Sequence, residues 1–235
     1  MKSSSDFDGI APYYDLLAKL VFGRQLNLAQ RHFINRLGNP SKILILGGGS
    51  GGILEPILAN YPTVHICYLE SSVKMLSLAK TRYSPDHYPI DYVLHRGDNQ
   101  FPIRSEFEVI ITPFVLDVFG SDELTIVVRE LLGSLKWEGL WIHTDYYTDN
   151  GGPWWRFLLV KMMYGFFRIT TGMKNQKLPD FDSIFEDMRL TSLGEKSYFH
   201  RLVKTTMYQK LRPGTKPLKE VSQHYPDNYR QHDGD

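Results

Sequence analysis

Five glycines fall within the six positions from Gly47 to Gly52, directly after the apolar run 43–46. Glycine has no Cβ, so a turn built from it can adopt positive φ and bring backbone amides within hydrogen-bonding distance of a ligand. Gly47, Gly49 and Gly52 satisfy the spacing of dinucleotide-binding turns. An acid, Glu70, ends the next apolar run, where it could accept a hydrogen bond from a ribose hydroxyl. These residues predict a nucleotide-type site.

The elements on either side of this turn would have to position it. Residues 43–46 carry no charge and indicate a strand buried on both faces, as in a parallel sheet. We expect a helix from Gly52 to Asn60 and a second strand from Val64 to Glu70. Strand, glycine turn, helix, strand and acid make up a βαβ unit. That order favours a ligand site over the alternative, a tight connection that binds nothing.

The rest of the chain continues the alternation of strands and helices. A helical segment is expected from Asp6 to Leu37, ended by Gly38, and another helix after a cap at Ser121. Further strands are expected at 91–95, 107–112, 140–144, 191–199 and 202–210, the last two as a closing pair. Segments 113–117 and 145–147 then lie at the carboxyl ends of strands, where ligands bind in open parallel sheets.

The composition limits the class of protein. With 235 residues, 42% of them hydrophobic and 13% aromatic, the chain can bury one core as a single domain. A net charge of +1 gives no electrostatic reason to expect a nucleic-acid partner, so a small-molecule substrate fits better. Cys67 is the single cysteine, which excludes an intramolecular disulfide and implies a reducing cytoplasm. We expect no signal peptide, no membrane-spanning run of about 18 apolar residues and no bound metal.

These residues resemble the class I S-adenosylmethionine (SAM)-dependent methyltransferases. Residues 43–51 are similar to the first motif of that family, 73–80 to the helix after its ribose-binding acid, and 96–103 to its adenine-contacting segment. The resemblance covers roughly residues 7–210 and is nearest, through segment 7–15, to the ubiquinone/menaquinone methyltransferase branch. It implies an α/β, Rossmann-like fold, with a mostly parallel seven-stranded sheet, an antiparallel last strand and helices on both faces.

The resemblance also implies SAM as the methyl donor and suggests its contacts. Glu70 would bind the ribose and Asp98 the adenine, while Tyr14 belongs to a flap that closes over the donor. The positions that correspond to donor contacts are Gly47, Gly48, Gly49, Ser50, Gly51, Glu70, Ser71, Met75, Asp98, Asn99, Pro113 and Tyr14. One position departs from the pattern, because the family usually has an acid two residues before the first glycine and this chain has Ile45. The ammonium group of the donor would then need other contacts.

Methyl transfer from a sulfonium is an in-line displacement, so the protein mainly has to align donor and acceptor and exclude water. A base helps if the acceptor is a phenol, an enol or an acidic carbon. The candidates are Asp117, His143, Asp145 and Tyr146, because they come from loops or strand ends that face the site. Asp145 is the preferred candidate for this base. The alternatives are that His143 is a core residue and that Asp145 caps a helix or loop.

Residues 153–173 are crowded with apolar side chains, among them Trp154, Trp155 and Phe157. A helix that is apolar around most of its circumference must be covered by something. One possibility is that protein covers it, as core or as a homodimer contact. The other is that it forms a lid over an apolar acceptor and makes a peripheral contact with a membrane surface.

The expected organisation is one methyltransferase domain, residues 1–210, followed by a mobile tail, 211–235. The domain would include a helical flap at 6–37 and a helical substrate-lid insert at 150–189. Its expected function is SAM-dependent methylation of a small, apolar or aromatic acceptor.

Three other functions remain open. An NAD-dependent oxidoreductase would suit the glycine spacing and Glu70, but no Tyr-x-x-x-Lys pair is placed for hydride transfer. An aminopropyltransferase similar to spermidine synthase has a comparable glycine turn, but such enzymes carry acids where this chain has Ser50 and residues 112–114. A SAM-binding protein without catalysis is the third.

Overall fold

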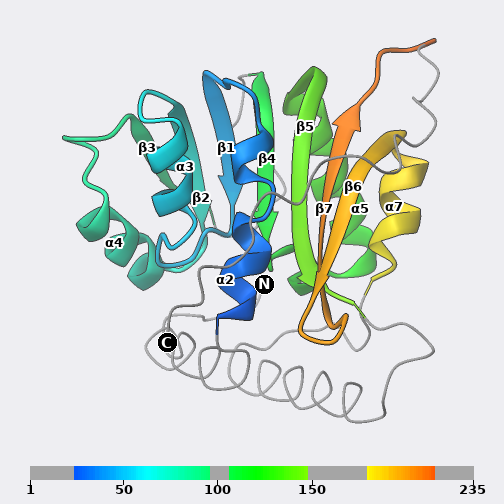
Figure 1. Ribbon diagram of the computed structural model, residues 1–235, viewed down its shortest axis with the longest axis horizontal. Helices are drawn as coiled ribbons and strands as arrows, with labels where there is room; N and C mark the ends of the chain where they lie inside the picture. Colours follow the sequence, from blue (N-terminus) through cyan, green and yellow to red (C-terminus); the bar gives the residue numbers. More distant parts are fainter. Residues whose placement is uncertain (1–23, 96–105, 148–178, 215–235) are drawn as a thin grey trace, which may run out of the picture.

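The computed structural model describes residues 24–95, 106–147 and 179–214. In these ranges one sheet contains seven strands in the order β3-β2-β1-β4-β5-β7-β6 (Figure 1). The strands are β1 (Lys42–Leu46), β2 (His65–Glu70), β3 (Ile90–Leu94), β4 (Phe107–Pro113), β5 (Leu135–Tyr146), β6 (Leu190–Tyr198) and β7 (Val203–Lys210). Strands β1 to β5 are parallel, whereas β7 is antiparallel to both of its neighbours, β5 and β6. The predicted Rossmann-like sheet is confirmed.

Helices cover both faces of the sheet, and Figure 1 shows α2 and α3 in front of it and α5 behind it. The elements on the first face are α2 (Gln25–Arg31), the 3₁₀ turn η1 (Ile34–Arg36), α3 (Leu54–Asn60) and α4 (Val73–Arg82). The helices on the second face are α5 (Ser121–Ser134) and α7 (Phe181–Asp187). A second 3₁₀ turn, η2 (Leu116–Val118), follows β4. Each face is packed by its own apolar cluster.

Strand β1 is buried on both faces, which accounts for its unbroken apolar sequence. Ile43 and Ile45 pack in the cluster on the α3 side, whereas Leu44 and Leu46 pack in the cluster on the α5 side. All four side chains are buried. The strand is therefore fixed from both sides, and so is the start of the glycine turn that follows it.

The boundaries of two helices differ from the prediction. Helix α3 begins at Leu54 rather than at Gly52, because Gly51 adopts a φ of 89° and the turn continues through the next two residues. Helix α5 begins at Ser121 itself, with Gly120 in the N-cap position. The Gly120 amide donates to the carboxylate of Glu123 at 3.3 Å. A glutamate in the first turn, rather than a capping serine, therefore bonds at this helix start.

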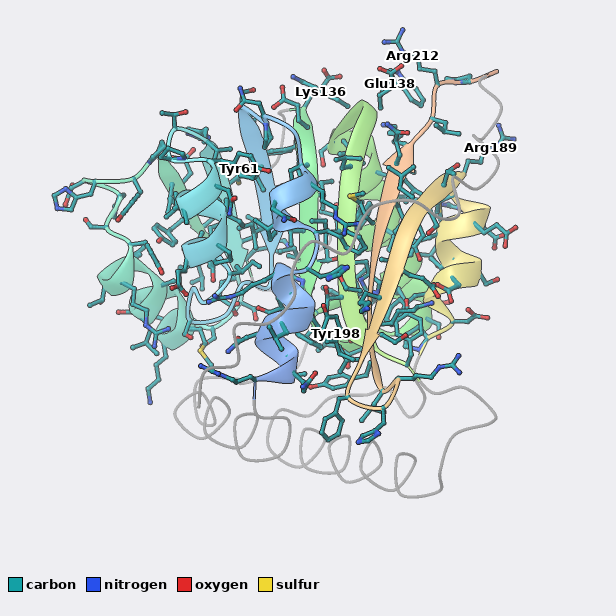
Figure 2. All side chains as sticks on the ribbon, viewed as in Figure 1. Tyr61, Lys136, Glu138, Arg189, Tyr198 and Arg212 are labelled. Carbon is teal, nitrogen blue, oxygen red and sulfur yellow. The ribbon has the colours of Figure 1, made fainter. Side chains whose placement is uncertain are left out.

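Strand β5 begins five residues earlier than expected, because a bulge lies inside it. Phe107 pairs with Leu135 and Val109 with Leu140, so a single residue of β4 faces the four residues 136–139 of β5. A Cβ on Gly139 would lie 2.8 Å from the Lys136 carbonyl oxygen, which explains the glycine. Figure 2 shows Lys136 and Glu138 of this bulge at the end of the sheet opposite Tyr198.

None of the helices in the described ranges is long and apolar enough to cross a membrane. The expected flap, 6–37, is described only from residue 24 onward, and the expected insert, 150–189, only from residue 179 onward. The described part of the expected tail is 211–214.

Candidate functional site

The glycine turn leaves β1 at the point where the order of the sheet reverses. β1 pairs with β2 on one side and with β4 on the other, so the chain crosses to opposite sides of β1 in succession. In open α/β sheets ligands bind outside the carboxyl ends of the strands at such a position. Gly47, Gly49 and Gly51 adopt φ values of 73°, 62° and 89°, which side chains with a Cβ rarely tolerate. The backbone conformation of the turn therefore requires glycine at these three positions.

The turn is packed against protein on one side and open at its middle. A Cβ on Gly47 would lie 2.5 Å from Cβ of Val115, and one on Gly48 would lie 2.3 Å from Cζ of Tyr68. A Cβ on Gly49 would meet no atom within 4 Å. The backbone at Gly49 is therefore open to close approach by a ligand, as it is at Gly52.

Glu70 lies at the end of β2, where it joins the glycine turn to the start of α4. One carboxylate oxygen accepts from the Gly49 amide at 2.9 Å, and the other accepts from the amides of Ser71 and Ser72 at 2.8 and 2.9 Å. Glu70 is only 7% exposed, so these bonds hold a nearly buried carboxylate in one orientation. Oε2, which accepts only the Gly49 bond among these, has a further lone pair and can still accept from a ribose hydroxyl.

The helix that follows Glu70 supports the same edge of the site. Ser72 caps α4 by accepting from the Met75 amide at 3.2 Å. From the last turn of α4, Arg82 donates to the carbonyl and hydroxyl oxygens of Ser50 at 3.1 and 3.2 Å. The expected donor contacts Ser50, Ser71 and Met75 thus lie on, or are bonded to, the elements that hold the turn. Arg82 was missed, because nothing in the spacing of the sequence connects it to position 50.

Two buried acids follow β4 and β5. Asp117 in η2 and Asp145 near the end of β5 are 8% and 0% exposed. Burial raises the pKa of Asp145 well above its ordinary value, the negative charge of Asp117 raises it further, and hydrogen bonds from backbone amides oppose both effects. One of these amides, that of Tyr146, donates to Asp145 Oδ1 at 2.9 Å. Asp145 can therefore hold a proton at a pH at which an exposed aspartate is ionised.

Pro113 is the last residue of β4, where it pairs with Thr144, and it is also buried. The next residue, Phe114, adopts a φ of 52°, and its ring lies 5.1 Å from that of Tyr146. These contacts fix the start of the segment that leads to Asp117. The acidic pair and Pro113 thus share the carboxyl edge of the sheet with the glycine turn.

His143 lies deeper in the molecule than the two acids. Its ring packs 4.5 Å from Phe181 and 5.1 Å from Phe185, both on α7. Nδ1 is 3.2 Å from the Thr112 hydroxyl, and burial, with a smaller contribution from the charge of Lys204, lowers the pKa of His143 to about 3. This placement matches the core-residue alternative. A neutral imidazole enclosed by aromatic rings is poorly placed to take a proton from an acceptor.

The remaining expected site residues lie outside the described residues: Tyr14, Asp98, Asn99, Trp154, Trp155 and Phe157. Within the described ranges, no group of three or more His, Cys, Asp or Glu side chains is placed to hold a metal ion. The part of the site that the structure describes is therefore the glycine turn, the Glu70 network and the acidic pair.

Part of the chain is similar to known methyltransferases. Residues 43–139, which include the turn, Glu70 and the segment after β4, match the family described as "Methyltransferase domain". Demethylmenaquinone methyltransferase of Chlamydia felis (strain Fe/C-56) is 31% identical over 105 residues, which are 44% of each chain. The chain spans less than half the length of the curated relatives it matches.

Solved structures share the fold at low identity. The putative methyltransferase bound to the Trm112 activator of Haloferax volcanii aligns over 90% of this chain and 100% of its own, with a TM-score of 0.68 and 13% identity. Human N-acetylserotonin methyltransferase, crystallised with SAM, aligns over 86% of this chain and 60% of its own, with a TM-score of 0.57 and 15% identity. The described part of the chain thus has the fold of these solved methyltransferases, and residues 43–139 are similar to a methyltransferase domain family.

Proposed function

We propose that the protein transfers a methyl group from SAM to a small acceptor. The observation that carries this proposal is a glycine turn open at Gly49, bonded to a nearly buried Glu70 at the reversal point of the sheet. Backbone amides of such a turn suit the negative end of a ligand, and a carboxylate at the end of β2 suits a ribose hydroxyl. The match of residues 43–139 to a methyltransferase family supports the same donor.

The residues of the chain would mainly bind and align the reactants. Bound SAM supplies an electrophilic methyl group, which moves to the acceptor while S-adenosylhomocysteine departs. Glu70 would bind the ribose and the glycine turn the methionine end, at the same edge of the sheet as Asp117 and Asp145. Holding reactants in line and excluding water accounts for most of the catalysis expected of such a site.

We propose Asp145 as the base that receives the proton of a hydroxyl or carbon acceptor. Burial and the neighbouring charge of Asp117 raise its pKa, so its carboxylate binds a proton more tightly than that of an exposed aspartate. Asp145→Asn should lower kcat by about 100-fold or more while leaving the affinity for S-adenosylhomocysteine within about twofold of the parent. Asp182→Asn is a matched control, because it removes an exposed acid that pairs with Lys204 on the same side of the sheet. A variant at 145 with parental kcat would refute this role.

We propose an apolar or aromatic acceptor, such as a quinone precursor. The support is the similarity to demethylmenaquinone methyltransferases and the aromatic sequence around Trp154 and Phe157. Incubation with SAM labelled in the methyl group, followed by extraction into organic solvent, tests a panel of naphthols, quinols, catechols and polar amines. Label in the quinol or phenol products is the expected result. Label only in polar amines, or no transfer with any class, would count against it.

A further inference from the structure

Tyr68 lies directly beneath the glycine turn. It belongs to β2, two residues before Glu70, and its side chain is fully buried. A Cβ at position 48 would lie 2.3 to 2.4 Å from three atoms of the tyrosine, Cζ, Oη and Cε2. The ring therefore fills the space that a side chain on residue 48 would occupy, and Gly48 is required for this reason, since its φ is not among the positive values.

The hydroxyl of Tyr68 bonds to the turn itself. It donates to the Gly49 carbonyl at 2.9 Å, while the amide of the same glycine donates to Glu70 at 2.9 Å. Burial raises the pKa of Tyr68 well above its ordinary value, so the hydroxyl keeps its proton and remains a donor. Gly49 is thus held through both its amide and its carbonyl at the position where the turn is open.

The neighbours of Tyr68 leave its ring little freedom. In the sheet it pairs with Ile45 of β1 and with Tyr92 of β3. The rings of Tyr68 and Tyr92 are 5.3 Å apart, and Ile45 is fully buried in the same apolar cluster. The neighbouring strands β1 and β3 therefore hold Tyr68 in place, and Tyr68 in turn supports the backbone of the glycine turn.

We propose that Tyr68 is a positioning residue for the methyl donor, which sets the orientation of the Gly49 peptide groups and thereby the shape of the donor-binding turn. This inference rests on the proposed function, because it assumes that the donor binds at the open face of Gly49. It also accounts for two features of the sequence together: a glycine at 48, which makes room for the ring, and an apolar residue at 45, which packs beside it.

The test compares Tyr68→Phe with Tyr92→Phe in the full-length protein. Each variant loses one phenolic hydroxyl on neighbouring strands, but the Tyr92 hydroxyl bonds to the carbonyls of Tyr83 and Ala79, at 2.7 and 3.3 Å, and not to the turn. Titration calorimetry with S-adenosylhomocysteine should show a loss of affinity of roughly five- to tenfold for Tyr68→Phe and less than about twofold for Tyr92→Phe. Equal affinities for the parent and both variants, or equal losses of affinity in both variants, would overturn the proposal.

A second experiment places Gly48→Ala in several backgrounds. It tests the fit between the Tyr68 ring and Gly48 and does not depend on the hydroxyl. Gly48→Ala should weaken binding by about tenfold or more in the parent and in the Tyr68→Phe background, because the clashing ring atoms Cζ and Cε2 remain. In a Tyr68→Leu background, which lacks these ring atoms, the same change should cost no more than about threefold. The same loss in all backgrounds would overturn the proposal. If the unaltered protein fails to bind S-adenosylhomocysteine, the proposed function fails instead.

Discussion

Ile45 stands where class I methyltransferases usually carry an acid, and its surroundings explain the exchange. In the sheet, Ile45 pairs with Tyr68 of β2 and with Ile111 of β4. Its side chain is fully buried and belongs to an apolar cluster. A carboxylate at this position would lose its hydration without gaining a partner. At this position the packing around Ile45 accounts for the difference from the class I methyltransferase pattern.

Ile45→Asp should therefore destabilise the fold by at least about 3 kcal/mol. Ile45→Val, which removes one methyl group and adds no charge, should cost about 1 kcal/mol. Urea denaturation followed by circular dichroism measures both values. An aspartate variant as stable as the parent, and with severalfold tighter binding of SAM, would contradict this explanation and would indicate a degraded donor site.

The residues of the donor half of the site were more predictable than those of the acceptor half. Glycines at fixed spacing and an acid at the end of the next strand express backbone requirements that any sequence must meet, so Gly49 and Glu70 could be singled out. The role of Tyr68 depends on contact across two strands, which the sequence alone does not reveal. His143 illustrates the same limit, because only the position of Phe181 and Phe185 shows that it faces the core.

At the scale of elements, Glu108 joins three strands at the end of the sheet opposite the candidate site. Its carboxylate accepts from the amides of Ser41 and Lys42 at 2.6 and 2.9 Å, from the Ser41 hydroxyl, and from Lys136 in the bulge of β5 at 2.8 Å. Partial burial alone would raise the pKa of Glu108, but the bonds from Lys136, Ser41 and the two amides outweigh it and lower the pKa to about 2. The bulge that extends β5 is thus anchored to the start of β1.

The pH dependence of this anchor follows from the sign of the shift. Because the pKa is lower in the folded protein than the ordinary value of 4.5, the stabilisation is complete above pH 4.5 and is lost as the pH falls toward about 2. Glu108→Gln should therefore lower Tm by roughly 2–4 °C at pH 7, and the difference from the parent should vanish toward pH 2. Thermal unfolding at a series of pH values measures this. A difference that stays constant from pH 7 to pH 2 would show that the charge of Glu108 contributes nothing.

The order and type of the elements could be predicted because the central strands β1, β2 and β4 are short, mostly apolar and bounded by turns. The uncharged centres of β1 and β4 indicate burial on both faces, and the regular apolar positions of α5 indicate a helix. Local details could not be predicted in the same way. The bulge of β5 depends on pairing with β4, and at the start of α5 the Gly120 amide bonds to the Glu123 carboxylate.

At the scale of the whole molecule, the sheet lies between two helical layers, and the candidate site lies at one edge of this sheet. The α3 and α4 layer and the α5 and α7 layer bury the two faces separately, so the carboxyl ends of β1, β2, β4 and β5 are held rigidly side by side. The proposed donor contacts and the acidic pair come from different strands of this edge.

The central claim is that the glycine turn and Glu70 bind SAM, and calorimetric titration of the full-length protein tests it directly. S-adenosylhomocysteine and SAM should bind at one site per chain and more tightly than decarboxylated SAM or NAD. Glu70→Ala should weaken binding of both ligands by at least about tenfold, whereas Gly133→Ala in α5, whose added Cβ would meet no atom within 4 Å, should change it little. Tighter binding of NAD or of decarboxylated SAM, or unchanged binding by Glu70→Ala, would contradict the claim.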